Sequence, residues 1–140
     1  QLPNDMPAGE VIMLYEAQLE AADGWVGDNF PKRCVNFGPG ILAGFIGSKV
    51  GVDENTVWFE PDGTPKISEI NPTLDKNNFW YKRIMELTRI ASERWKGKAA
   101  IGYTDLGGNL DIVASLRGTQ DLLLDCMDEP EESCWRKQPN

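Results

Sequence analysis

The chain has 140 residues, a length that suits one domain, and 41% of them are hydrophobic, which is enough to bury a core. It carries 14 Lys and Arg against 22 Asp and Glu, a formal net charge of −8, and such an acidic chain repels phosphate backbones. We therefore expect no nucleic acid among its partners. No apolar run approaches the roughly 20 residues that span a bilayer, so we expect no membrane partner either.

Histidine is absent from the sequence. This removes the commonest general base, the commonest metal ligand and any Ser-His or Cys-His nucleophile system. The odd number of cysteines, without a CxxC pair, argues against a disulfide scaffold. The spacing of Cys126, Asp128 and Cys134 does not support a metal site. We predict no metal within this chain and a reducing, cytoplasmic location.

The first third of the chain alternates helical and strand patterns. Residues 10–22 have helical spacing, and one face carries Val11, Leu14, Tyr15, Gln18, Leu19 and Ala22. Residues 32–37 are predicted to form a short strand. After the sharp turn at Gly38-Pro39-Gly40, the small-residue run at 41–46 is predicted to be a helix.

The middle of the chain contains the clearest helix, which we predict over 75–96. Its apolar stripe runs along more than four turns through Trp80, Ile84, Leu87, Ala91 and Trp95. Before it, residues 56–59 and 66–70 are predicted to be short strands. The helix passes directly into an apolar run at 99–103, so we predict half of a βαβ unit, with the stripe packed on a parallel sheet.

The last third of the chain is predicted to be helical. Asn109 or Asp111 is placed to cap one helix, Thr119 is placed to cap a second, and a third begins near Asp128. The whole order predicts an α/β fold. Two or three parallel strands usually need further strands to cover their edges, so we expect the chain to be part of a larger α/β structure.

Polar residues stand where the strand predicted at 99–103 ends. Tyr103, Thr104 and Asp105 precede Gly107-Gly108, which allows a sharp turn into the next helix. Polar groups at the carboxyl end of a strand are where α/β enzymes place their chemistry. Asp105 is the candidate functional carboxylate, and the alternative is an Asx turn or a helix cap. Asn109 has the same two interpretations, ligand or cap.

Two further segments have alternative interpretations. The turn at 36–40 is suited to bring backbone amides close to a ligand, or it is a plain strand-to-helix turn with glycines for steric relief. Arg117 has the planar fork that holds a substrate carboxylate, and the alternative is a structural ion pair.

Four blocks of sequence follow one another along the chain: Val35-Asn-Phe-Gly-Pro-Gly-Ile-Leu-Ala-Gly-Phe-Ile-Gly47, Thr56-Val-Trp-Phe-Glu-Pro61, Tyr103-Thr-Asp-Leu-Gly-Gly-Asn-Leu-Asp-Ile-Val-Ala-Ser-Leu-Arg-Gly118 and Leu124-Asp-Cys-Met-Asp-Glu-Pro-Glu-Glu132. Together they resemble the uroporphyrinogen decarboxylase superfamily, in its divergent decarboxylase-like branch. The resemblance extends in the right order from about Val11 to Glu132.

The resemblance implies a (β/α)8 TIM barrel of about 250 residues or more, with its cleft at the carboxyl ends of the strands. We expect residues 1–140 to be a single segment that holds about half of such a barrel. The remainder of the parent barrel is then its first partner.

The superfamily implies one of two chemistries. One branch decarboxylates the acetate side chains of a tetrapyrrole without metal or organic cofactor; an aspartate holds the pyrrole nitrogens and arginines hold the carboxylates. The other branch transfers methyl groups between a corrinoid protein and an acceptor such as a thiol, and uses zinc held by His and Cys. Neither set is complete here, because the arginine-rich N-terminal motif, the later zinc-ligand segment and all histidines are missing.

The resemblance places Asn36 near the position of the family's aspartate, and its amide can donate and accept but carries no charge. Catalytic roles are predicted for Asp105 and Tyr103. Substrate-binding roles are predicted for Asn36, Phe37, Gly38, Thr104 and Asn109.

We expect a fragment of a lyase that acts on a small-molecule substrate, a tetrapyrrole (porphyrin precursor) or a related polycarboxylate. One alternative is a corrinoid-dependent, zinc-using methyltransferase with a corrinoid protein as partner. The other is a non-catalytic binding or structural module. The intact parent is expected to be an enzyme and this chain alone inactive, because a barrel active site draws residues from several strand ends.

Overall fold

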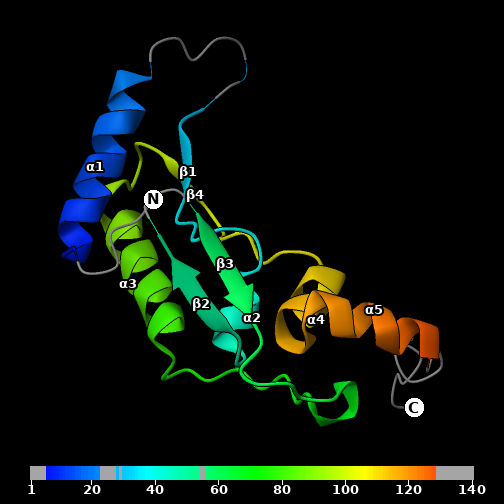
Figure 1. Cartoon of the computed structure of the whole chain (residues 1–140). Helices are drawn as coiled ribbons and strands as arrows, with labels where there is room; N and C mark the ends of the chain where they lie inside the picture. Colours follow the sequence, from blue (N-terminus) through cyan, green and yellow to red (C-terminus); the bar gives the residue numbers. More distant parts are fainter. Residues whose placement is uncertain (1–5, 23–27, 29, 54–55, 129–140) are drawn as a thin grey trace, which may run out of the picture. The chain divides into compact units, whose positions relative to one another are not determined.

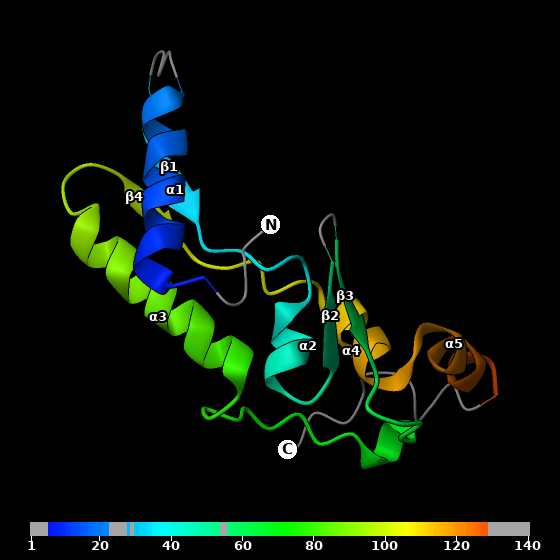
Figure 2. The ribbon, with the colours of Figure 1, turned by 60° about the vertical axis from the view of Figure 1, so that its left-hand side comes forward.

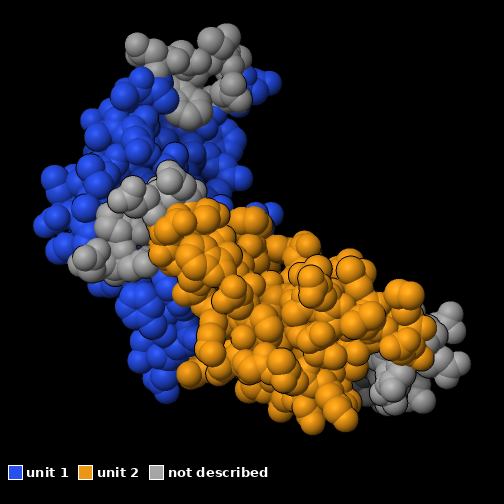
Figure 3. All heavy atoms as spheres, in the orientation of Figure 1, with its two compact units in different colours: residues 1–37, 76–105 blue, residues 38–75, 106–140 orange. Residues whose placement is uncertain are grey.

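The computed structural model describes residues 6–22, 28, 30–53 and 56–128, which form two compact units (Figure 3). The first unit contains residues 1–37 and 76–105, and the second contains 38–75 and 106–140. The described chain is mixed α/β, with five α-helices and a few short strands, in agreement with the predicted class. The helix predicted to begin near Asp128 lies outside the described residues.

The first unit is organised around two parallel strands. β1 (Lys32–Cys34) pairs with β4 (Ala100–Gly102), in a register that joins Lys32 to Ala100 and Cys34 to Gly102. Two helices, α1 (Ala8–Ala21) and α3 (Phe79–Arg94), lie side by side in this unit (Figures 1 and 2). The parallel pair predicted from the step between helix and strand is confirmed, although both strands are shorter than expected.

The helix α3 begins four residues later than predicted because Asn78 caps it. The Asn78 side chain accepts hydrogen bonds from the backbone N–H groups of Trp80, at 2.9 Å, and Tyr81, at 3.2 Å. The predicted apolar stripe is buried at Ile84, Leu87, Ala91 and Trp95, while Trp80 is half-buried. The stripe therefore forms the centre of the core of this unit.

The buried face of α1 coincides only in part with the predicted one. Ala8, Val11 and Ile12 are buried, whereas Leu14 is half exposed, so the prediction for Leu14 is wrong. At the same level Glu16 accepts a hydrogen bond from Arg94 and lies 3.6 Å from the Lys98 ammonium. A partly buried carboxylate thus joins α1 to the carboxyl end of α3.

The second unit begins with the short helix α2 (Ile41–Phe45), followed by a hairpin of β2 (Lys49–Val52) and β3 (Val57–Glu60). The hairpin is antiparallel and pairs Gly51 with Trp58. The sequence did not predict β2, because a glycine inside a short run weakens the strand pattern. The structure supplies the reason for this glycine: the Trp58 ring lies over Gly51, where a Cβ atom would collide with it.

Helices α4 (Asn109–Arg117) and α5 (Thr119–Asp128) complete the second unit. Ile112 and Leu116 of α4 pack with Ala43 of α2 in its core. The buried Ser48 hydroxyl lies 2.7 Å from the Glu60 carbonyl oxygen and 2.8 Å from that of Ser115. One hydroxyl proton serves both acceptors in turn, and it links the hairpin to α4.

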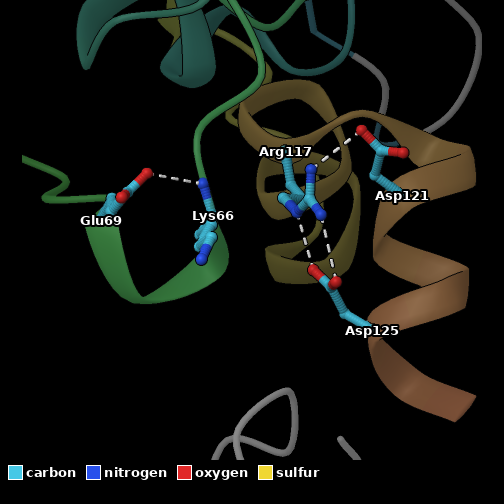
Figure 4. A network of polar contacts seen from close by, with 5 residues as sticks. All are labelled: Lys66, Glu69, Arg117, Asp121 and Asp125. Carbon is cyan, nitrogen blue, oxygen red and sulfur yellow. Dashed lines mark hydrogen bonds and ion pairs between the residues drawn. The ribbon is translucent and has the colours of Figure 1, made fainter. Parts of the chain in front are cut away.

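The short strand predicted at 66–70 is wrong. Residues Ile67–Glu69 form a single 3-10 turn, labelled η1, and its first backbone N–H group is held by a side chain. The Glu69 carboxylate accepts a hydrogen bond of 2.9 Å from the Lys66 backbone N–H (Figure 4). Together with the 2.9 Å hydrogen bond from the Glu69 backbone N–H to the Lys66 carbonyl oxygen, this contact closes the turn. Among the described helices, none has the length and apolar character needed to cross a membrane.

We predict that Trp95→Ala lowers the free energy of unfolding by about 3 to 5 kcal/mol, because Trp95 is 1% exposed and its removal leaves a large cavity. Trp95→Phe is the matched control: it keeps a buried aromatic ring, and the indole N–H that it removes has no hydrogen-bond partner among the described residues, so the loss should be smaller than in the alanine variant. Denaturant titration measures both. A loss below about 0.5 kcal/mol in the alanine variant would contradict the packing described here.

Candidate functional site

The candidate site lies at the carboxyl ends of the parallel strands β1 and β4. Their last register pair is Cys34 and Gly102, and two residues farther along the chains stand Asn36 and Thr104. Parallel strands end at the same edge of a sheet. The structure therefore brings together two polar segments, 36–37 and 103–105, that are separated by more than sixty residues in the sequence.

The side chains at this edge differ in exposure. Tyr103 is 86% exposed, and Asn36 and Asp105 are also exposed. Thr104 is half-buried, and its hydroxyl oxygen is inaccessible and has no hydrogen-bond partner among the described residues. A buried hydroxyl without a partner costs free energy and calls for an explanation, such as a ligand or a water. The edge thus presents a carboxylate, a phenol and an amide to solvent, beside a buried hydroxyl.

Phe37, predicted to bind substrate, is buried at 3% exposure. Its ring packs edge to face against Trp80, with 5.3 Å between the ring centroids. Trp80 was assigned from the sequence to the helix stripe alone. The contact places the amino end of α3 beside the carboxyl end of β1, which sequence spacing could not reveal.

Two of the predicted site residues, Gly38 and Asn109, belong to the second unit. Gly38 adopts a positive φ of 95°, so glycine is required there to turn the chain after β1. Asn109 is the first residue of α4 and Gly108 is the capping residue, without a side-chain hydrogen bond. The predicted capping by Asn109 or Asp111 is therefore wrong, and the binding role of Asn109 stays a prediction.

Within the second unit, the glycine loops that follow the two parallel strands approach each other closely. A Cβ atom at Gly107 would lie 3.0 Å from the Gly40 nitrogen and 3.1 Å from its Cα. Gly107 also has a φ of 75°. Both features require glycine at position 107.

We expect Gly107→Ala to destabilise the protein more than Gly63→Ala does. Gly63 also has a positive φ, of 86°, but a Cβ there meets nothing within 4 Å. The control carries the backbone strain alone, about 1 to 3 kcal/mol. Gly107→Ala adds the collision with Gly40 to this strain. Equal unfolding free energies for the two variants, measured in urea, would show that the loops are not in contact.

Arg117 holds α4 and α5 together rather than facing a ligand (Figure 4). Its Nε and Nη2 atoms donate to the two carboxylate oxygens of Asp125, at 2.7 and 3.1 Å. Its Nη1 atom donates to Asp121 at 2.9 Å. The guanidinium is 13% exposed and both of its edges are occupied by carboxylates. Of the two interpretations given to Arg117, the structural ion pair describes the observed contacts.

These contacts have a pH signature. The hydrogen bond and charge of Arg117 hold the pKa of Asp125 below its usual value, against the opposing effect of desolvation. A depressed folded-state pKa contributes stability above the unfolded-state pKa of about 3.9, and this stability is lost as the pH falls through the folded-state pKa.

We therefore predict that Asp125→Asn lowers the urea midpoint at pH 7 and that its difference from the wild type shrinks below about pH 4. Asp128→Asn, on the exposed end of the same helix, is the control and should change the midpoint little. A difference for Asp125→Asn that is constant from pH 7 to about pH 3 would exclude the ion pair as its cause.

Comparison of the chain with protein-family profiles, with curated proteins and with solved structures found no match. Among the described residues, no group of three or more Cys, Asp and Glu side chains is arranged to hold a metal ion. The candidate site is thus defined by its own geometry, as a set of neutral donors with one carboxylate at the ends of two parallel strands.

Proposed function

We propose that this chain is a segment of a uroporphyrinogen decarboxylase-like enzyme, a lyase that acts on a tetrapyrrole or a related polycarboxylate. The observation that carries the proposal is the parallel pairing of β1 with β4. It brings the start of the first resembling block, at Asn36, beside the start of the third, at Tyr103 to Asp105. These are the two segments in which the resemblance implies the cleft residues.

The chain path is compatible with two neighbouring units of a (β/α)8 barrel. Each strand of the pair is followed by a glycine turn and a helix, α2 after β1 and α4 after β4. The helix α3 leads directly into β4, as a crossover helix does. On this proposal the hairpin β2–β3 is an insertion in the chain between two barrel strands.

The residues at the strand ends suit a ligand that carries both N–H groups and carboxylates. The Asp105 carboxylate accepts from pyrrole N–H groups, and the Asn36 amide accepts or donates beside it. The Tyr103 phenol donates to a substrate carboxylate. In decarboxylation a proton from solvent first adds to a ring carbon of the pyrrole. The bond from the acetate methylene to its carboxyl carbon then breaks, carbon dioxide leaves, and the protonated ring accepts the electron pair. A second solvent proton adds to the methylene carbon, and the ring carbon returns its proton to solvent. Side chains that hold the ring rigidly favour this step.

The methyltransferase alternative fits the residues of this chain less well. Zinc in that branch is held by His and Cys, and the chain has no histidine. The described cysteines, Cys34 and Cys126, lie in different units and do not belong to any candidate metal cluster of the described residues. We therefore derive no step through zinc or a corrinoid.

Titration with uroporphyrin, a stable octacarboxylate tetrapyrrole, tests the proposal through its Soret absorbance. We expect saturable binding that Asp105→Asn weakens about tenfold, since a hydrogen bond to a charged group contributes about 1.5 to 3 kcal/mol. Asp62→Asn is the matched control, because Asp62 is an exposed carboxylate of the second unit that pairs with Lys49 and lies outside the proposed site.

The same titration with hydroxocobalamin separates the two branches. Saturable cobalamin binding without uroporphyrin binding would move the assignment to methyl transfer. No binding of either compound, or equal effects of Asp105→Asn and Asp62→Asn on uroporphyrin binding, would leave the non-catalytic module as the better description.

A further inference from the structure

A hollow of about 270 Å³ opens on one face of α3, apart from the residues of the proposed lyase site. It is lined by Phe79, Lys82, Arg83 and Glu86. These positions are related by steps of three, one and three residues, so they share one face of the helix over two turns. An exposed aromatic ring, two cations and one carboxylate therefore surround the same space.

The two cations, Lys82 and Arg83, differ in how far they are buried and paired. Arg83 is only 9% exposed, and arginine is seldom buried to this degree unless its donors are paired. Its Nη1 atom donates to Glu86 at 3.1 Å and its Nη2 atom to the Met6 carbonyl, whereas Nε has no partner among the described residues. The Lys82 ammonium forms no ion pair with a described residue. Positive charge in the hollow thus exceeds the single carboxylate that faces it.

The ring of Phe79 is exposed to solvent and in contact with a neighbouring ring. It is 56% exposed, yet it is held edge to face against Trp80, with 5.2 Å between centroids. Trp80 is held in turn against the buried Phe37. A ring fixed by its neighbours loses little conformational entropy when a ligand packs on it.

We propose that this hollow binds a small aromatic monocarboxylate, a single planar ring that carries one carboxylate group. The ring packs on Phe79, and the carboxylate lies between Lys82 and Arg83. The volume lies just below the usual range for ligand pockets, about 300 to 1,000 Å³, and accommodates one planar ring. Glu86 repels a second negative charge and so favours the monocarboxylate. The proposal does not depend on the lyase assignment.

The test is a titration of the full chain with benzoate, followed by the backbone amide signals of residues 79–86 in two-dimensional NMR. We expect a roughly millimolar Kd, as for other ligands of this size. Benzamide, which lacks the charge, and cyclohexanecarboxylate, which lacks the aromatic ring, should each bind at least about fivefold more weakly. Acetate measures the binding of the anion alone.

Variants with opposite expected effects separate a binding site from a general loss of structure. Lys82→Gln and Phe79→Leu should weaken benzoate binding, whereas Glu86→Gln should tighten it, because Glu86 competes with the ligand for Arg83. Arg89→Gln is the control, since Arg89 pairs with Glu93 on the same helix and does not line the hollow. Acetate or cyclohexanecarboxylate binding as tightly as benzoate, weaker binding to Glu86→Gln, or signals that move equally across the chain would overturn the proposal.

Discussion

The pairing of two three-residue strands, β1 and β4, is the constraint on which the first unit depends. Two parallel strands cannot be joined by a tight turn. After the carboxyl end of β1, the chain must return to the amino end of the sheet before β4 can pair with it. The helix α3 makes the return, and its buried stripe is what holds the strands. Because parallel strands end together, the same pairing decides which polar residues meet at the candidate site. A slip of one residue would replace Asn36 and Thr104 with other neighbours and turn each side chain to the other face.

A small residue on β4 protects that register. A Cβ atom at Gly102 would collide with the Cys34 sulfur and lie 2.9 Å from the Lys32 side chain. Side chains of β1 therefore cross the space that glycine leaves on its partner strand. Each strand of the pair has one neighbour within the described part of the chain, and parallel sheets of so few strands rarely stand alone because their edges remain unpaired.

The sequence predicted the buried face correctly where an apolar pattern repeats over several helical turns. The stripe of α3 spans four turns, so its buried residues followed from periodicity, although the start did not, because the Asn78 cap overrides the apolar pattern. The shorter patterns failed for identifiable reasons. On α1 the apolar residues Leu14 and Ile12 compete for the buried face, and the structure buries Ile12, at 0% exposure, rather than Leu14. The sequence at Ile67–Glu69 has the pattern of a short strand. The hydrogen bond from the Lys66 backbone N–H to the Glu69 carboxylate, which that pattern does not indicate, holds the segment in a turn. At the site, position along the strands was predictable, but the burial of Phe37 and of the Thr104 hydroxyl depends on packing between distant segments.

The distribution of charge gives the candidate site its chemical character. Most of the described arginines are held by carboxylates: Arg83 by Glu86, Arg89 by Glu93, Arg94 by Glu16 and Arg117 by Asp121 and Asp125. Arg33 instead donates a hydrogen bond to the Gln18 side chain. Its guanidinium lies over the Tyr15 ring, 4.4 Å from the ring centroid, and so affects the pKa of Tyr15. Burial raises the Tyr15 pKa more than Arg33 lowers it, so Tyr15 stays neutral and no anion is created there. Among the described residues, the strand ends of the first unit thus carry neutral hydrogen-bonding groups and a single carboxylate, that of Asp105. The strength of a hydrogen bond depends on its direction, so such a set is suited to orient a bound molecule rather than to attract charge from a distance.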